Sequence, residues 1–164
     1  MSEKNDIRIG QILLDQGVLT EQQVFEIIQA QKDGAVPFGV LAERMFDVTV
    51  ESIELAWVEQ YCRFSGPIDL AHQQFDTEAL RLINRRQAWQ FEILPIRYES
   101  GGELLMAASR KRLARAVTFV ARRLEPAVYF RVADSRQLRE FLMTHYPMPE
   151  VSAELLKRAS EMAC

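Results

Sequence analysis

Apolar residues between positions 7 and 62 recur with the spacing of amphipathic helices. Gly17 fits the left-handed position that ends one helix. Thr20 then begins the next helix, and Gln23 three residues later completes a capping box. This pattern predicts a helical hairpin. The residues that share its apolar faces are Ile9, Ile12 and Leu13 in the first helix and Val24, Ile27 and Ile28 in the second.

The hairpin pattern returns when the sequence is shifted by 29 residues. The identical positions are Gly10 and Gly39, Thr20 and Thr49, and Gln31 and Gln60, and the apolar positions Ile9, Val24 and Ile28 fall on Phe38, Ile53 and Trp57. Because the helical phase and the start signal both repeat, a duplication explains the pattern better than chance does. We therefore predict a duplicated helical hairpin of four short helices, with residues 32–36 as the connector.

The hydrophobic period changes after a break that contains Gly66 and Pro67. In chain order, the second half predicts a helix over 76–92, strands over 93–100 and 102–109, a helix over 111–124, a strand over 127–134 and a helix over 135–146 that is capped by Ser135. The predicted fold class is α+β. Its parts are the helical-hairpin subdomain at residues 1–64, a small α+β subdomain with a three-stranded sheet at 65–147, and a C-terminal tail at 148–164.

Composition and charge are those of an ordinary soluble protein: 48% of the 164 residues are hydrophobic, 26% are charged, and the net charge is −3. Such a weak net charge gives no reason to expect nucleic-acid binding. Cys62 and Cys164 do not form a disulfide framework, which suits a reducing compartment. No apolar run is long enough to span a membrane. We expect a cytoplasmic protein, at most held at the inner face of the inner membrane.

The sequence contains no legible catalytic or metal-binding grouping. His72 and His145 lack cysteine or carboxylate neighbours at metal-ligand spacing, so a metal site is not expected. Asp69 and His72 share a turn-like segment, which is too little for a catalytic assignment. The phosphate-binding loop G-x-x-x-x-G-K-[ST] is not present. The sequence thus predicts a protein that is not an enzyme.

Residues 8–31 carry a longer pattern, formed by Arg8-Ile9-Gly10, Leu13-Leu14, Gly17-Val18-Leu19, Val24, Ile28 and Gln31. This resembles the first of two tandem motifs in the MshEN-type N-terminal domain of type II secretion and type IV pilus assembly ATPases. In that family the two motifs stand five residues apart and together hold cyclic di-GMP. The spacer here, residues 32–36, has the same length, and the resemblance extends to about residue 147.

The second motif, residues 37–60, departs from the family pattern. It begins with Pro37-Phe38-Gly39 where Arg-Leu-Gly is expected, Phe46 replaces its second glycine, and Glu43 and Asp47 stand at aliphatic positions. Loss of the second arginine is expected to weaken ligand binding, because a hydrogen bond to a charged group contributes about 1.5–3 kcal/mol. Either of two nearby cations, Arg44 or Arg63, is a candidate to compensate.

The resemblance implies a cyclic di-GMP site in which Arg8 supplies charge and a stacking plane. Gly10 would open the start of a helix to a phosphate. The alternative for Gly10 and Gly39 is close helix packing, and for Phe38 and Trp57 it is a place in the core. The predicted ligand residues are Arg8, Ile9, Gly10, Val24, Ile28, Gln31, Phe38, Gly39, Ile53, Trp57 and Gln60.

The predicted function is a non-enzymatic regulatory domain that binds cyclic di-GMP and passes the signal to an attached or partner protein of a secretion, pilus or envelope system. One alternative is the C-terminal domain of a membrane glycosyltransferase-like phage-adsorption receptor. The other is an adaptor that has lost nucleotide binding and docks onto an inner-membrane platform or an ATPase. Its docking residues would be Arg112, Arg115 and Arg122, which share the basic face of helix 111–124 with Lys111 and Arg123. That face is otherwise a solvated surface or a contact for anionic lipid.

Overall fold

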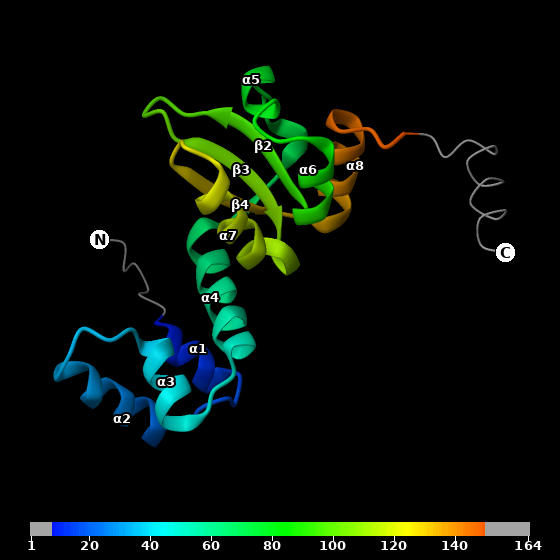
Figure 1. The fold of residues 1–164 in the computed structure, drawn as a ribbon. Coiled ribbons are helices and arrows are strands. Elements are labelled where there is room, and N and C mark those ends of the chain that lie inside the picture. The colour runs from blue at the N-terminus through cyan, green and yellow to red at the C-terminus, as the bar shows by residue number, and fades with distance from the viewer. Residues whose placement is uncertain (1–7, 150–164) are drawn as a thin grey trace, which may run out of the picture.

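The computed structural model describes residues 8–149. Four helices form the N-terminal unit, and a sheet with surrounding helices forms the second unit (Figure 1). The first four helices are α1 (Ile9–Asp15), α2 (Glu21–Lys32), α3 (Phe38–Phe46) and α4 (Val50–Ser65). The remaining elements are β1 (Pro67–Ile68), the short 3-10 helix η1 (Leu70–His72), α5 (Thr77–Leu80), α6 (Arg85–Phe91), β2 (Ile93–Tyr98), β3 (Leu104–Ser109), the 3-10 helix η2 (Arg110–Arg112), α7 (Leu113–Arg123), β4 (Val128–Ala133) and α8 (Ser135–His145).

Local sequence signals start and end the N-terminal helices as predicted. The Thr20 amide donates to Oε1 of Gln23 at 2.9 Å, and the Gln23 amide donates to Oγ1 of Thr20 at 3.3 Å, which completes the capping box of α2. Gly17 has a φ of +70° and follows the end of α1. In the second copy Asp47 takes the left-handed conformation, with a φ of +51°. Aspartate tolerates this conformation better than most residues, so the turn persists without the second glycine.

The duplication is also visible in how the helices pack. Helix α1 packs against α4, and α2 packs against α3, so the first helix of each hairpin packs against the second helix of the other. The Leu19 amide donates to the Leu13 carbonyl at 3.2 Å, and its counterpart Val48 donates to the Ala42 carbonyl at 3.4 Å. Corresponding positions are buried in one core. The pairs are Leu13 and Ala42, Leu19 and Val48, and Ile27 and Ala56.

The sheet has four strands, in the order β1-β4-β3-β2, and not the three that were predicted. Strands β2 and β3 are antiparallel, whereas β4 runs parallel to both β3 and β1. The additional strand, β1, pairs Pro67 with Val132 and Ile68 with Ala133. Two residues are too few to show an alternating pattern, which is why the sequence did not reveal this strand. The three predicted strands correspond to β2, β3 and β4.

Two further predictions in the second half are wrong. Residues 76–92 form two short helices, α5 and α6, because Asn84 starts a new helix by accepting a 2.9 Å hydrogen bond from the Gln87 amide. Ser135 does not cap α8. Oδ1 of Asp134 accepts hydrogen bonds from the amides of Arg136 and Gln137, at 3.0 and 3.1 Å, so the carboxylate one residue earlier is the cap.

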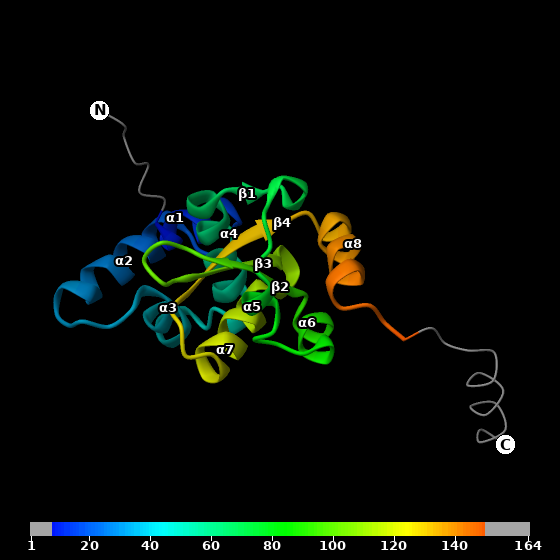
Figure 2. The same ribbon diagram turned by 90° about the horizontal axis from the view of Figure 1, so that it is seen from above.

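Helix α4 joins the two units (Figure 1). Ala56 is buried in the N-terminal core, and Val58 is buried in the core beneath the sheet. The Tyr61 hydroxyl donates to the Phe130 carbonyl at 2.7 Å and accepts from the Phe130 amide at 2.9 Å. Burial raises the pKa of Tyr61, which keeps the hydroxyl able to donate. In both views α8 lies away from α2 (Figures 1 and 2).

Candidate functional site

The N-terminal helices and α7 border a cavity of about 480 Å³, here called the seam cavity. Residues of both predicted motifs meet there. Ile9 comes from α1, Gly39 comes from α3, and Ile53 and Trp57 come from α4. The wall is completed by three residues of α7, namely Ala114, Val117 and Thr118. A volume of this size lies within the usual range for small-molecule sites, about 300–1,000 Å³.

The two motif glycines occupy corresponding close contacts. A Cβ atom at Gly39 would lie 2.9 Å from Cγ2 of Ile53. A Cβ atom at Gly10 would lie 3.4 Å from Cγ1 of Val24, the residue that corresponds to Ile53, and 2.9 Å from Cζ of Phe38. Gly10 is buried. The expected opening of its backbone toward a ligand is therefore filled by the Phe38 ring, and close helix packing explains both glycines.

Five other predicted ligand residues lie on the N-terminal helices or directly before them. The side-chain amide of Gln31 donates to the Val36 carbonyl at 3.0 Å and so holds the connector between the hairpins. Arg8 is exposed and precedes α1, where its carbonyl accepts from the Gln11 amide at 3.0 Å. Val24 and Gln60 are half-buried, and Ile28 is exposed. A ligand role for each of these residues stays a prediction.

The seam cavity is apolar with an acidic edge. The charged residues among those that line it are Glu43 and Glu54. Pro37 also lines the cavity, at the place where the second motif is expected to start with arginine. Since like charges repel strongly in a partly desolvated site, a phosphate requires a cation from a neighbouring position.

A second cavity, of about 330 Å³, adjoins the seam cavity and is here called the arginine cavity. Both are lined by Glu54, Ala114 and Thr118. Phe91 and Phe119 stack with their ring centroids 4.3 Å apart and their planes 17° apart. Both rings line the arginine cavity together with Arg115, Arg122 and Arg123.

Two of the three predicted docking residues line the arginine cavity, and the third does not. It is lined by Arg115 and Arg122 of that group, and Arg123 of the same basic face joins them. Arg112 is half-buried and precedes α7 as its N-terminal cap residue. The sequence pattern does not reveal that this basic face lines a cavity beside the seam cavity. The buried residues of α7, Leu113, Ala116 and Val120, lie on its apolar side, but helical spacing alone does not say which part of the chain covers that side.

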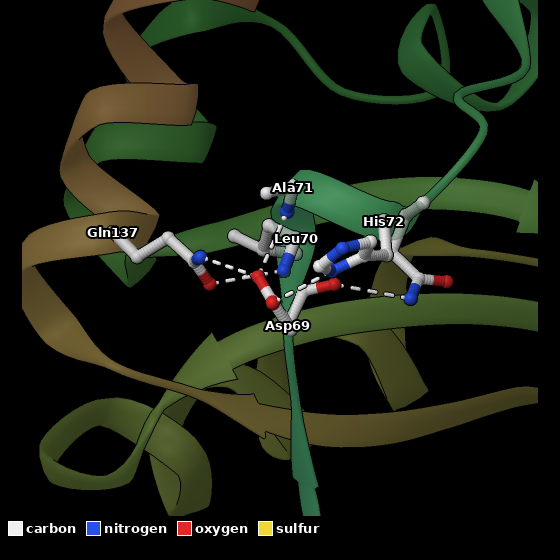
Figure 3. A network of polar contacts seen from close by, with 6 residues as sticks. Asp69, Leu70, Ala71, His72 and Gln137 are labelled. Atoms are coloured by element: carbon white, nitrogen blue, oxygen red, sulfur yellow. Dashed lines mark hydrogen bonds and ion pairs between the residues drawn. The ribbon is translucent and has the colours of Figure 1, made fainter.

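Asp69 and His72 come together in a polar network that fastens η1 to α8 (Figure 3). The Gln137 side chain donates to Oδ1 of Asp69 at 2.6 Å and accepts from the Leu70 amide at 2.9 Å. Nδ1 of His72 lies 2.8 Å from Oδ2 of Asp69, and its side chain is 82% exposed. The hydrogen bond from Gln137, followed by that from the Ala71 amide, lowers the pKa of Asp69. These hydrogen bonds hold η1 against α8, and this structural role accounts for the network.

Neither a metal-ligand cluster nor a membrane-spanning helix is found in the described part of the chain. Residues 8–149 contain no cluster of three or more histidine, cysteine, aspartate or glutamate residues arranged to hold a metal ion. Within the same residues, none of the helices has the length and apolar character required to cross a membrane.

The chain is similar to one protein family and to several solved structures. The family model of the MshEN domain matches residues 60–152. No curated protein matched the chain. A solved structure of MshE with cdg is 21% identical, covers 85% of this chain and 99% of its own, and has a TM-score of 0.47. Two crystal structures of the N-terminal domain of XpsE are each 15% identical and cover 89% of this chain and 98% and 99% of their own, with TM-scores of 0.45 and 0.44.

Proposed function

The chain belongs to the MshEN domain family, and on this premise we propose that it is a regulatory domain that binds cyclic di-GMP and is not itself catalytic. The observation that carries the proposal is the complete first motif at residues 8–31, whose Ile9 lines the seam cavity together with three predicted ligand residues of the second motif, Gly39, Ile53 and Trp57. The matched residues 60–152 lie almost entirely after the two motifs. Ligand binding therefore rests on the motif and the cavity, and not on the family match.

The chemistry of the seam cavity suits a purine base. Ile9 and Ile53 offer aliphatic contacts, and the half-buried Trp57 offers an aromatic face. Stacking of a base on an aromatic side chain contributes about 1–3 kcal/mol. Arg8, next to Ile9 and exposed, supplies positive charge for one phosphate. Cyclic di-GMP offers both features, two purines and two phosphates.

The same cavity supports a route for the signal. Its walls come from the N-terminal helices and from α7, and α4 contributes to both cores. A ligand that contacts both sides favours the arrangement in which they are close, and so shifts the population of orientations. In this proposal residues 1–64 hold the ligand, residues 65–147 receive the signal, and an attached or partner protein of a secretion, pilus or envelope system responds.

Isothermal titration of the full chain with cyclic di-GMP tests the proposal. We expect saturable binding, and a loss of about 1.5–3 kcal/mol in binding free energy for Arg8→Ala, because a charge-assisted hydrogen bond is removed. Arg136→Ala is the matched control, since this side chain is 90% exposed on α8, away from the N-terminal helices. An absence of heat at high micromolar ligand contradicts the proposal.

A second function is supported by the arginine cavity. Arg115, Arg122 and Arg123 form an exposed cationic group, which suits an acidic segment of an inner-membrane platform or an ATPase. In this function the domain is an adaptor at the inner face of the membrane. Capture of such a partner that is lost in Arg115→Glu, but kept in Arg8→Ala, is the result expected of an adaptor.

A further inference from the structure

The second motif has no cation of its own at the seam cavity. Pro37 stands where the motif pattern expects arginine. Of the two predicted substitutes, Arg63 is held by Glu59, with 2.8 Å between Nε and Oε1. Arg44 lies in the last turn of α3, and that helix lines the cavity through Gly39, Val40 and Glu43. Neither Arg44 nor Arg63 is among the residues that line the seam cavity, so the neighbouring helix α7, which does line it, is the candidate source of a compensating charge.

Helix α7 brings cations to the edge of the cavity. The seam cavity and the arginine cavity share Glu54, Ala114 and Thr118, so they adjoin along one side of α7. Arg115 and Arg122 line the arginine cavity and are exposed. Within residues 8–149 neither side chain takes part in an ion pair. By contrast, the arginines that pair with carboxylates elsewhere in this part of the chain include Arg63, Arg97, Arg110, Arg136 and Arg139.

Glu54 stands at the junction of the two cavities. A carboxylate there repels a phosphate, but it accepts hydrogen bonds from a base. Guanine presents two donors, N1–H and N2–H, on one edge, whereas adenine presents a single amino group there. A glutamate beside an apolar cavity and near arginines thus suits a guanine nucleotide better than an adenine nucleotide.

We propose that α7 supplies the positive charge that the second motif lacks, with Arg115 and Arg122 binding one phosphate of a cyclic dinucleotide whose guanine lies in the seam cavity against Glu54. This inference rests on the proposed function and deepens it. Arg8 binds the other phosphate, so the two phosphates are held by different units of the protein. The ligand then ties the N-terminal helices to α7, which couples its binding to the relative position of the two units.

The first test is titration of the full chain with cyclic di-GMP, using Arg115→Ala, Arg122→Ala and the double variant. Each single variant is expected to bind about tenfold more weakly, because one charge-assisted contact is lost. Its affinity should also depend less steeply on salt. The matched control, Arg136→Ala, should bind like the unaltered chain. Because Arg115 and Arg122 are exposed, thermal unfolding should be unchanged in all variants.

The outcomes separate this inference from the proposed function. If the unaltered chain does not bind cyclic di-GMP, the proposed function fails and the inference fails with it. If the unaltered chain binds but the double variant binds within twofold of it, the inference is overturned while the proposed function stands. The inference is likewise overturned if the double variant loses only the capture of an acidic protein.

The second test addresses the base, and it compares cyclic di-GMP with cyclic di-AMP on the unaltered chain and on Glu54→Gln. Removing the carboxylate also removes a repulsion, so the ratio of the two dissociation constants is the quantity to follow. We expect the preference for cyclic di-GMP to fall about tenfold in Glu54→Gln, because a hydrogen bond to a charged acceptor is lost. An unchanged ratio overturns the role of Glu54 as the guanine acceptor.

Discussion

The two helical hairpins share their packing and differ in their charge. The second copy keeps a glycine at its start, a threonine cap and a left-handed residue after its first helix, although Asp47 now takes that last role. What it lacks is the arginine, because Pro37 occupies that position. The residues of the motif that serve packing can thus be kept while those that serve ligand binding are lost. The second hairpin keeps the packing residues, and in the proposed site α7 supplies the charge that the hairpin lacks.

The two copies also contribute differently to their shared core. The first copy supplies large side chains, Leu13, Leu19 and Ile27, where the second supplies the smaller Ala42, Val48 and Ala56. Large and small residues thus share one buried cluster, and a close-packed core needs such complementary volumes. Stability should therefore depend more on the first copy than on the second.

The largest expected effect comes from removing core volume from the first copy. Leu13→Ala should lower the free energy of unfolding by about 2–5 kcal/mol, because Leu13 is fully buried and its loss leaves a cavity. The corresponding change in the second copy, Ala42→Gly, should cost about 1 kcal/mol, mainly through helix propensity. Urea unfolding followed by circular dichroism measures both. Equal losses would contradict the asymmetry.

Restoring the arginine of the second motif sharpens the comparison of charge. Pro37→Arg should strengthen cyclic di-GMP binding by about 1.5–3 kcal/mol, since it adds a charge-assisted contact beside the seam cavity. It should also rescue binding in the Arg115→Ala, Arg122→Ala background. Calorimetric titration measures both effects, with Arg136→Ala as the control. An equal gain in affinity for inorganic phosphate would indicate unspecific attraction.

The two motif glycines should differ in how they tolerate a methyl group. Gly39→Ala should lower stability by about 1–3 kcal/mol, because the branched Cγ2 of Ile53 lies close to its own backbone and moves little. Gly10→Ala should cost less, because the atom it meets is the far end of the Phe38 ring. Thermal unfolding compares them. In a Phe38→Leu background, Gly10→Ala should become neutral, and a remaining loss would point to another contact.

The smallest expected effect concerns the turn after the first helix of each hairpin. Gly17→Ala should cost about 1 kcal/mol, because alanine disfavours a φ of +70°. Asp47→Gly should raise stability by a few tenths of a kcal/mol up to about 1 kcal/mol, because glycine removes the strain at a φ of +51°. Differential scanning calorimetry resolves such shifts. A stabilising Gly17→Ala would show that the turn relaxes.

Signals that act over a few residues predicted much of the fold. The capping box at Thr20 and the left-handed Gly17 depend on neighbouring residues, and the structure confirms both of them. Strand β1 was not found, because two residues carry no period. The division of residues 76–92 was not found either, since the Asn84 cap lies within a stretch of otherwise helical apolar spacing.

By itself the sequence determined the helical hairpins, their duplication, the order of the three longer strands along the chain and the motif that points to a cyclic dinucleotide. Only the tertiary structure decided that Phe38 fills the space beside Gly10, that α7 borders the seam cavity, and that Arg115 lines the adjoining arginine cavity. The physical reason is that periodicity specifies which face of a helix is apolar, whereas the partner of that face depends on how distant helices cross.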